Sequence, residues 1–330
     1  MSNLEKDPAE VLLEERPRTS AAGGDASASA RLLSPREVPL GGPRAMTVRR
    51  TLPQRGRSLI GAWCFLDHYG PDDVAERGGM VVPPHPHTGL QTVSWLFAGE
   101  VEHRDSVGSR ARVRPGEVNL MTAGLGIQHS EVSTPSTTVL HGAQLWVALP
   151  DADRHTAPQF EHFAPTPVQF AGGSVTVFIG SLAGSSSPVR TFSPLLGAQV
   201  DLPAGGRLSL EVDPGFEHGV LVDRGDLQVE GEVVPEHALA YFEPGRSALV
   251  LEATTAVRLL LIGGTPLGEE IVMWWNFIGR THEEVVAARE EWQREVVGGA
   301  DPRGRFGSMD YPGPPLPSPE LPTERLRPRA

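Results

Sequence analysis

The chain has 330 residues, of which 39% are hydrophobic, and this is enough to form a sizeable core in one or two domains. Its 41 acidic and 29 basic residues leave a formal net charge of −12, so the overall field repels phosphate backbones and anionic membrane surfaces. We therefore expect neither direct binding to nucleic acid nor binding to a membrane.

A single cysteine, Cys64, excludes an internal disulfide framework and a cysteine-rich zinc site. The first residues do not have the pattern of a secretory signal, and no stretch approaches the roughly 18 apolar residues of a membrane span. These features predict a soluble cytoplasmic protein.

Glycine (37) and proline (31) are frequent, and sustained helical periodicity is scarce. This combination is typical of short strands joined by tight turns, so the predicted fold class is all-β. Residues 1–35 are rich in acidic residues, proline, serine and alanine, and they carry too little apolar surface to order themselves. We expect them to form a flexible leader.

The chain that follows the leader reads as a series of strands. A strand and a turn are expected between Ile60 and Val82, and a further strand from Thr92 to Phe97 ends near Gly99. The segment Val101–Ser106 is expected to return antiparallel to that strand as a hairpin. Two more strands are predicted in this half, at Val118–Thr122 and Gly142–Pro150.

Two pairs of potential metal ligands stand at matching spacing beside these strands: His85 with His87, and His129 with Glu131. Residues two apart in an extended segment leave it on the same face, so three imidazoles and a carboxylate would converge from two neighbouring strands. Such a set suits a divalent first-row metal and is close to the two-His, one-carboxylate sites of non-haem Fe(II). Each histidine could instead cap a turn or satisfy a buried polar group, but two matched pairs in one predicted sheet favour the metal site.

The second half repeats the pattern of short strands between turns, from Phe216 to Ile262, and we interpret it as a degenerate copy of the first barrel. His218 falls near the position of the first histidine pair. Phe216 stands at the partner position, however, and no His-x-Glu segment follows. We therefore expect no metal in the second barrel.

The segment Thr281-His282-Glu283-Glu284 has the form of a capping box, and apolar residues follow it at helical spacing. A helix is predicted at residues 282–297, before a proline-rich tail that starts at Gly298. The predicted organisation is thus a leader at 1–35, a first barrel with the metal site at 36–165, a second barrel without metal at 166–280, and a helix with its tail at 281–330.

Three segments of the first half resemble the signature segments of the pirin family, namely His85-Pro-His-Thr-Gly-Leu-Gln-Thr-Val-Ser-Trp-Leu, Leu120-Met-Thr-Ala-Gly-Leu-Gly-Ile-Gln-His-Ser-Glu131 and Gln144-Leu-Trp-Val-Ala-Leu-Pro150. The resemblance implies two tandem cupin barrels of the double-stranded β-helix (jelly-roll) type over about residues 35–297. It also implies that the first barrel binds iron through His85, His87, His129 and Glu131. Fe(II) is therefore the expected metal, with Mn, Zn, Ni or Cu as alternatives.

The resemblance implies two different functions. Pirins include quercetin 2,3-dioxygenases, which open the flavonol ring with O2, and iron-dependent regulators that bind transcription factors or metabolic enzymes. The implied partners are accordingly a small phenolic substrate with O2, or a protein. A third reading is a sugar-binding or isomerase-like cupin with Zn or Mn. We favour the dioxygenase, because the proposed ligands leave coordination positions for substrate and O2.

Several residues near the ligands have candidate roles. Glu131 is expected to serve catalysis as well as metal binding, and His103 on a flanking segment is a candidate catalytic residue. His68 and His141 are candidates for hydrogen-bond donors or proton acceptors near the metal, and a purely structural role is the alternative. Gln91 stands where many cupins and pirins have a glutamate, which implies a neutral amide and altered hydrogen bonding beside the metal.

Overall fold

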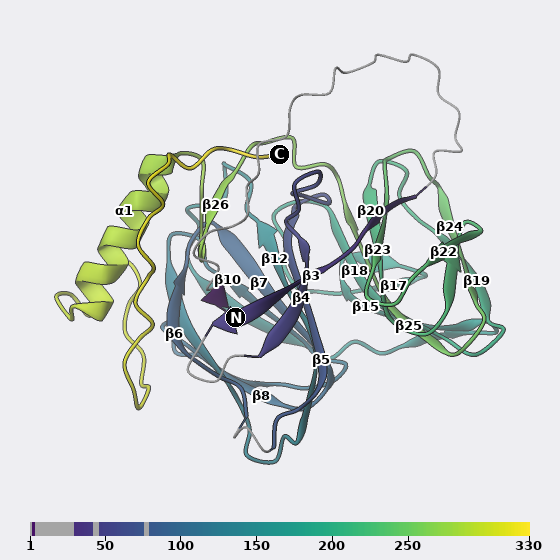
Figure 1. The fold of residues 1–330 in the computed structure, drawn as a ribbon, viewed down its shortest axis with the longest axis horizontal. Coiled ribbons are helices and arrows are strands. Elements are labelled where there is room, and N and C mark those ends of the chain that lie inside the picture. Colours follow the sequence, from purple (N-terminus) through teal and green to yellow (C-terminus); the bar gives the residue numbers. More distant parts are fainter. Residues whose placement is uncertain (1, 4–29, 42–45, 76–78) are drawn as a thin grey trace.

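The computed structural model describes residues 2–3, 30–41, 46–75 and 79–330. Most of the predicted leader, residues 1–35, lies outside these described residues. The described chain consists mainly of strands, with one short helix near the C-terminus (Figure 1). The predicted all-β fold of two tandem cupin barrels with a C-terminal helix is confirmed.

The first barrel is built from a large sheet and a small sheet that face each other. The order of the large sheet is β1 (Ser2–Asn3), β3 (Arg36–Gly41), β4 (Thr47–Leu52), β5 (Trp63–Asp73), β12 (Val139–Ala148), β7 (Leu90–Ala98), β10 (Val118–Thr122) and β13 (Gln159–Phe163). The order of the small sheet is β6 (Val81–His87), β11 (Ile127–Ser133), β8 (Val101–Asp105) and β9 (Arg110–Val113).

The second barrel repeats this arrangement. Its large sheet has the order β14 (Val168–Phe170), β15 (Gly173–Ile179), β18 (Leu195–Leu202), β25 (Val257–Gly264), β20 (Glu217–Arg224), β23 (Leu239–Phe242) and β2 (Arg31–Leu33). Its small sheet has the order β19 (Arg207–Glu211), β24 (Ala248–Ala253), β21 (Leu227–Val229) and β22 (Glu232–Val234). Two short hairpins complete the described strands, β16 (Ser181–Leu182) with β17 (Ser185–Ser186) and β26 (Val272–Trp274) with β27 (Phe277–Gly279).

The outer faces of the two large sheets pack against each other. One apolar cluster joins Trp63, Trp95 and Leu145 of the first barrel to Leu221 and Leu260 of the second. A buried polar contact reinforces this interface, because the carboxylate of Glu217 accepts hydrogen bonds from the Gly61 amide at 2.6 Å and from the Tyr241 hydroxyl at 2.7 Å. The large sheets are therefore buried on both faces, one against the other barrel and one inside their own.

The domain boundaries at 165/166 and 280/281 stay predictions. Strand β2 precedes the first barrel in sequence, but it pairs with β23 of the second barrel, with Leu32 opposite Ala240. The chain between β2 and β3 therefore crosses from one barrel to the other.

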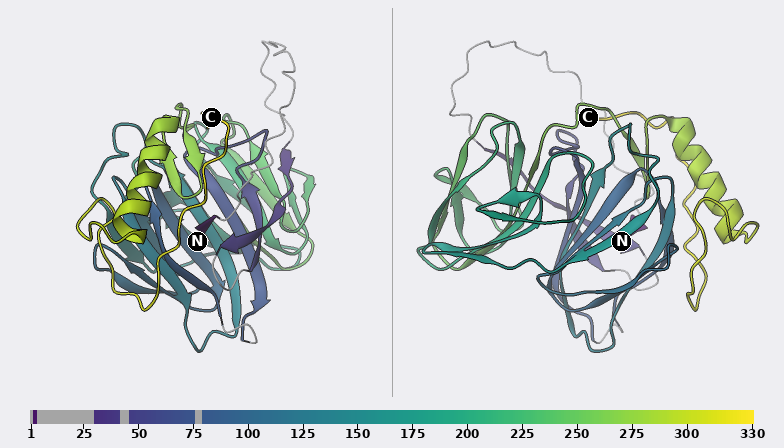
Figure 2. Two further views of the ribbon diagram at one scale, coloured as in Figure 1. Left: turned by 60° about the vertical axis from the view of Figure 1, so that its left-hand side comes forward. Right: turned by 180° about the vertical axis from the view of Figure 1, so that it is seen from behind.

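The predicted helix is present. Helix α1 (His282–Trp292) begins after Thr281, whose side chain caps it by accepting from the Glu284 amide at 3.2 Å, and it continues as a π-helical turn, η1 (Gln293–Val297). The helix and the tail lie on the first barrel, on the side away from the second barrel (Figure 2). The Leu316 amide donates to the Pro84 carbonyl at 2.8 Å, which fixes the tail beside strand β6.

One predicted pairing is wrong. Strand β8 does not return beside β7 as a hairpin, since β7 pairs with β12 and β10, whereas β8 pairs with β11 and β9. Gly99 between them has a φ of +90°, and a Cβ there would meet the Val139 carbonyl at 2.6 Å. This tight corner carries the chain from the large sheet into the small sheet. No helix of the described residues is long and apolar enough to cross a bilayer.

Candidate metal centre

Strands β6 and β11 bring the predicted histidines together. They pair antiparallel, with His85 directly opposite His129, and the extended backbone of β6 keeps His87 on the same face as His85. The ring centroids lie 4.3 Å apart for His85 and His129, 5.1 Å for His85 and His87, and 5.0 Å for His87 and His129. The three imidazoles therefore form one compact group.

These imidazoles have the burial and protonation of metal ligands. All three residues are fully buried, and burial lowers the pKa of His85 to about 3 and those of His87 and His129 well below the usual value. Nε2 of His85 and Nε2 of His129 have no hydrogen-bond partner in the described chain, whereas a backbone hydrogen bond with Asn276 acts against the lowering of the His87 pKa. Buried lone pairs without partners are costly, and a divalent cation would satisfy them. The nitrogen donors thus fit such a cation.

Hydrogen bonds behind the candidate ligands select tautomers with a free lone pair. His85 donates from Nδ1 to the Pro83 carbonyl at 2.9 Å, which leaves the Nε2 lone pair free. His103 donates from Nε2 to Asp105 Oδ2 at 3.0 Å, and its Nδ1 therefore accepts from His129 Nδ1 at 3.3 Å. This Asp105–His103–His129 chain leaves Nε2 of His129 free for a metal.

Glu131 lies beside the imidazole group. One carboxylate oxygen of Glu131 lies within 4.8 Å of one ring nitrogen of His129 and of one ring nitrogen of His103. In a separate group, one ring nitrogen from each of His85, His87 and His129 lies within 4.8 Å of the other two. Glu131 is 2% exposed, and Ser94 Oγ lies 3.4 Å from its Oε1. The structure therefore places the three predicted histidines in one group and Glu131 in an overlapping one.

The sequence analysis missed two residues that position this site, Asp105 and Ser94. A signal for Asp105 was available, because His103 and Asp105 are two apart in a strand and so leave it on one face. His103 itself lies behind His129, stacked on Phe160 with ring centroids 4.6 Å apart. This position suits the orientation of His129, and a direct catalytic role for His103 stays a prediction.

Of the two alternatives for His68 and His141, the structure supports the structural one. They lie between the barrels, where Nε2 of His68 and Nε2 of His141 approach Oδ1 of Asp223 at 2.7 and 2.6 Å. The ligand atoms of these three residues would also fit a cation, since they fall within 4.8 Å of one another. Arg49 Nε, however, donates to His68 Nδ1 at 3.2 Å, so Nε2 of His68 carries the proton and hydrogen-bonds to Asp223.

Gln91 departs from the expectation, because its amide points away from the metal ligands. Its Nε2 donates to Thr122 Oγ1 and to the Arg190 carbonyl, both at 2.9 Å. Gln91 shares its face of β7 with Val93 and Trp95, which pack in the core between the barrels. The side chains of Thr92 and Ser94 leave β7 on the opposite, inner face.

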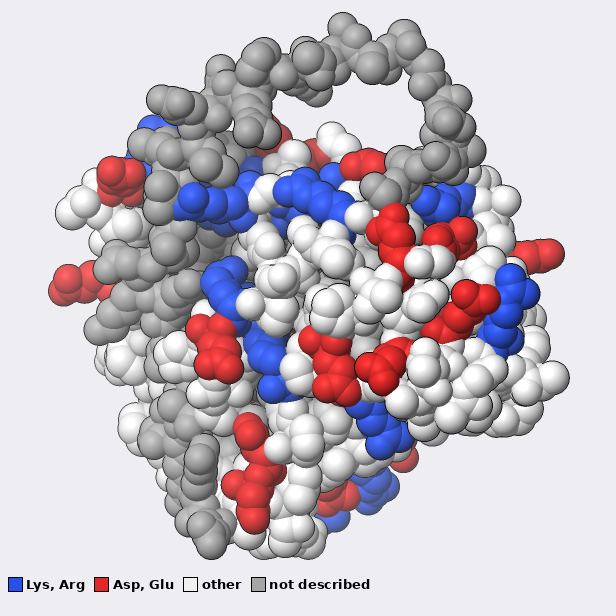
Figure 3. Space-filling view, turned by 45° about the vertical axis from the view of Figure 1, so that its right-hand side comes forward, with Lys and Arg blue, Asp and Glu red and all other residues white. Residues whose placement is uncertain are grey.

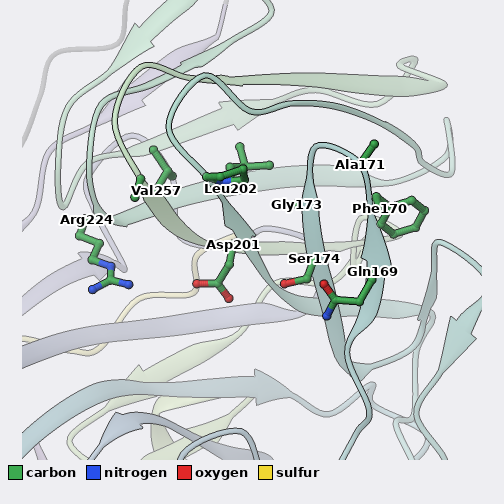
Figure 4. Close-up of a pocket in the computed structure, with 11 residues that line it drawn as sticks. Gln169, Phe170, Ala171, Gly173, Ser174, Asp201, Leu202, Arg224 and Val257 are labelled. Atoms are coloured by element: carbon green, nitrogen blue, oxygen red, sulfur yellow. The ribbon is translucent and has the colours of Figure 1, made fainter.

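The second barrel offers a different kind of cavity. A pocket of about 360 Å³ opens at the ends of β15, β18 and β20, and Figure 4 shows Asp201 between Arg224 and Ser174. The described residues that line this pocket include no histidine. On the face seen in Figure 3, acidic and basic side chains are interspersed.

Inside the second barrel, His218 is fully buried, and neither of its ring nitrogens has a partner among the described residues.

Two family models match the chain. The Pirin model matches residues 45–147, and the Pirin C-terminal cupin domain model matches residues 197–298. The first match contains the imidazole group, Glu131 and His103, and the second covers most of the second barrel.

Known proteins resemble most of the chain. A Pseudomonas aeruginosa protein, provisionally named a quercetin 2,3-dioxygenase, is 46% identical over 87% of this chain and 89% of its own length. A pirin-like protein of Caulobacter vibrioides is 35% identical over 74% of this chain and 88% of its own length. The crystal structure of a quercetin 2,3-dioxygenase from Acinetobacter baumannii has a TM-score of 0.83 and 38% identity, and the match covers 90% of this chain and 98% of that one.

Proposed function

The chain belongs to the pirin family of the cupin superfamily, and on this premise we propose that its first barrel is an Fe(II)-dependent dioxygenase site that cleaves a flavonol or a related enediol with O2. We propose His85, His87, His129 and Glu131 as the ligands. The observation that carries the proposal is the convergence of buried imidazole nitrogens without hydrogen-bond partners in the described chain. The names of the similar Pseudomonas and Acinetobacter proteins support the reaction class.

The donor set agrees with this choice of metal. Three neutral imidazoles and one carboxylate suit a divalent first-row ion, and in an octahedral count they leave two positions open. When bound, the ion would polarise a substrate hydroxyl and supply the redox chemistry for O2. The same donor set accepts Mn, Zn, Ni or Cu, so the identity of the ion needs a direct measurement.

The chain's own residues would perform three tasks. Glu131 is the anionic group of the proposed ligand set, and its carboxylate would accept the proton of a substrate hydroxyl. Asp105 and His103 hold His129 in the tautomer with a free Nε2. The complete burial of the imidazoles keeps bulk water from the reacting groups. We also propose a cytoplasmic location, which the single buried free thiol of Cys64 supports.

The test is a metal analysis of anaerobically purified protein, followed by O2 uptake with a panel of flavonols and enediols. We expect about one iron per chain and O2 consumption that depends on a flavonol. Full iron content with no O2 uptake across the panel would overturn the dioxygenase. If such a protein also bound a protein partner differently in its ferrous and ferric states, the family's regulatory function would replace the enzymatic one.

A further inference from the structure

We propose that the inner face of the eight-stranded sheet is a hydrogen-bond-donating wall that binds substrate oxygen atoms through Gln144, Asn119 and Trp146. This inference rests on the proposed function and deepens it, because it specifies the substrate class. The substrate would be a molecule longer than one ring, with acceptor oxygens such as a carbonyl or an ionised hydroxyl at separate points along its edge.

A continuous polar row crosses this face of the sheet. The pairing registers place one residue of each successive strand side by side, and the row consists of Arg50, Asp67, Gln144, Ser94, Asn119 and His162. Their neighbours in sequence, such as Leu66, Val93 and Leu145, pack between the barrels. Because side chains alternate along a strand, the polar row faces the interior of the first barrel, except for His162 on the edge strand β13, whose side chain is 40% exposed.

A second, largely aromatic row lies next to the polar one. On five of these strands, the residue two positions from the polar one is also directly opposite its counterpart on the neighbouring strand. These residues are Phe65, Trp146, Thr92, Met121 and Phe160. The rings of Phe65 and Trp146 stack with centroids 4.1 Å apart and an interplanar angle of 13°. The inner face thus presents an apolar strip beside a polar one.

Three contacts show that both rows face the metal centre. Ser94 Oγ lies 3.4 Å from Glu131 Oε1. The Trp146 ring stands at 78° to the His87 ring, with centroids 5.1 Å apart. Phe160 stacks on His103, which holds His129. A molecule bound at the metal would therefore lie against this wall.

The wall carries donors that no described acceptor uses. Gln144 accepts from the Ser94 hydroxyl through Oε1 at 2.9 Å, and Asn119 accepts from His162 Nδ1 through Oδ1 at 2.6 Å. These bonds leave Gln144 Nε2 and Asn119 Nδ2 without partners in the described chain. Trp146 Nε1 likewise has no partner there. The three residues are 1%, 3% and 0% exposed. Buried donors of this kind are rare, because each costs the full desolvation of its N–H group.

The arrangement of the donors defines the ligand. Gln144 on β12 and Asn119 on β10 are separated by β7, so their backbones are about 10 Å apart at the usual strand spacing. A guest that engages both must extend across this distance and must accept hydrogen bonds rather than donate them. A flavonol, which has fused and linked rings with a ring carbonyl and ionisable hydroxyls, meets both requirements.

The test measures binding without turnover. Full-length protein is loaded with Zn(II), which is redox-inactive, and is titrated with a flavonol while the ligand absorbance and the protein fluorescence are followed. The variants Gln144→Met and Asn119→Leu each remove one donor at similar volume, and Trp146→Phe removes the indole N–H together with part of the ring volume. The matched control is Gln91→Met, which alters an amide on the outer face of the same sheet. Zinc content and thermal unfolding verify that each variant is folded and loaded.

We expect each inner-face variant to weaken flavonol binding about tenfold, while Gln91→Met leaves it unchanged. A flavan-3-ol has the same rings without the carbonyl, and at least one inner-face variant should leave its affinity unaltered. Wild-type affinity in all three folded and loaded variants would overturn the wall, even if wild-type iron protein consumes O2. Conversely, the variants could bind the flavonol more weakly while the wild-type iron protein takes up no O2. That result would support the proposed hydrogen-bonding wall and contradict the proposed dioxygenase activity.

Discussion

The two barrels share one architecture but differ inside. The interior of the second barrel is an apolar cluster that includes Val175, Leu210, Val220 and Leu259. The interior of the first barrel has apolar clusters as well, but a belt of histidine, amide and carboxylate side chains separates them. Several of the polar atoms in this belt are buried without a hydrogen-bond partner in the described chain.

This difference shows how a duplicated fold can separate stability from chemistry. Buried polar atoms without partners destabilise a protein by an amount comparable to a lost hydrogen bond each. The apolar interior of the second barrel and the shared apolar interface offset that cost for the first barrel. The first barrel can therefore retain a polar, metal-competent interior in a folded chain.

The largest effect is expected when a proposed ligand is removed. His87→Ala should lower iron affinity by more than the about 10- to 100-fold typical of changes behind the ligands, because it removes one of the proposed donors. His218→Ala removes the buried histidine of the second barrel and should leave the iron content unchanged. Iron per chain, measured after dialysis against a weak chelator, compares the two variants. Equal iron in both would show that the ligands are grouped wrongly.

Glu131→Gln sharpens the comparison within the first barrel. Loss of the anionic ligand raises the net charge of the centre and stabilises the ferrous over the ferric state, so some Fe(II) should remain bound and its oxidation should become harder. We expect O2 uptake with a flavonol to fall by about 100-fold or more per bound iron. Oxygen electrode rates, normalised to iron, measure this effect. Wild-type rates per iron would remove Glu131 from the chemistry.

A smaller effect is expected from Asp105→Asn. Oδ1 can still accept from the Val107 and Ser109 amides, but an amide nitrogen in place of Oδ2 cannot accept from His103 Nε2. The tautomer chain to His129 is then disturbed, and iron affinity should fall about 10- to 100-fold. Competition with a chromophoric chelator measures the affinity. Undiminished affinity would mean that the chain behind His129 does not orient it.

The smallest effect concerns the contact between the barrels. Burial lowers the pKa of His68 to about 4, although its hydrogen bond to Asp223 raises it. As the pH falls below about 6.5, His68 of the unfolded chain therefore binds a proton, whereas His68 of the folded chain binds it only near pH 4. The contribution of neutral His68 to the free energy of unfolding is present above about pH 6.5. By pH 5.5 the free energy of unfolding should be lower by about 1.4 kcal/mol.

The control for this pH effect is His68→Gln, whose side chain can still donate to Asp223 but does not titrate. Urea unfolding between pH 7.5 and 5 compares the two proteins. The difference in their unfolding free energies should change with pH in the direction that favours the variant in acid. Parallel curves would show that His68 does not contribute to the acid sensitivity.

The sequence predicted that His85, His87 and His129 converge, because the signal for this is local. A spacing of two in an extended segment fixes the side on which His85 and His87 emerge, and the same holds for His129 and Glu131. The partner strand followed from the presence of a second pair with the same spacing. The helix at 282–297 was also predicted by a local signal, its capping box.

The errors arose where local patterns lack information. Strands β5 and β7 are buried on both faces, so their hydrophobic pattern does not tell the inner face from the outer one. Gln91 was consequently placed beside the metal and His68 was considered for a role there, although both face the second barrel. The partner of β8 is set by the closure of the barrel, a non-local contact that no turn signal near Gly99 specifies.

The most direct test of the metal centre is anomalous diffraction at the iron edge from crystals of the full-length protein grown anaerobically with Fe(II). The account predicts one anomalous peak per chain, bounded by His85, His87, His129 and Glu131, and no peak in the second barrel. A peak at His68, His141 and Asp223 between the barrels, or no peak in a protein that retains its fold, would contradict it.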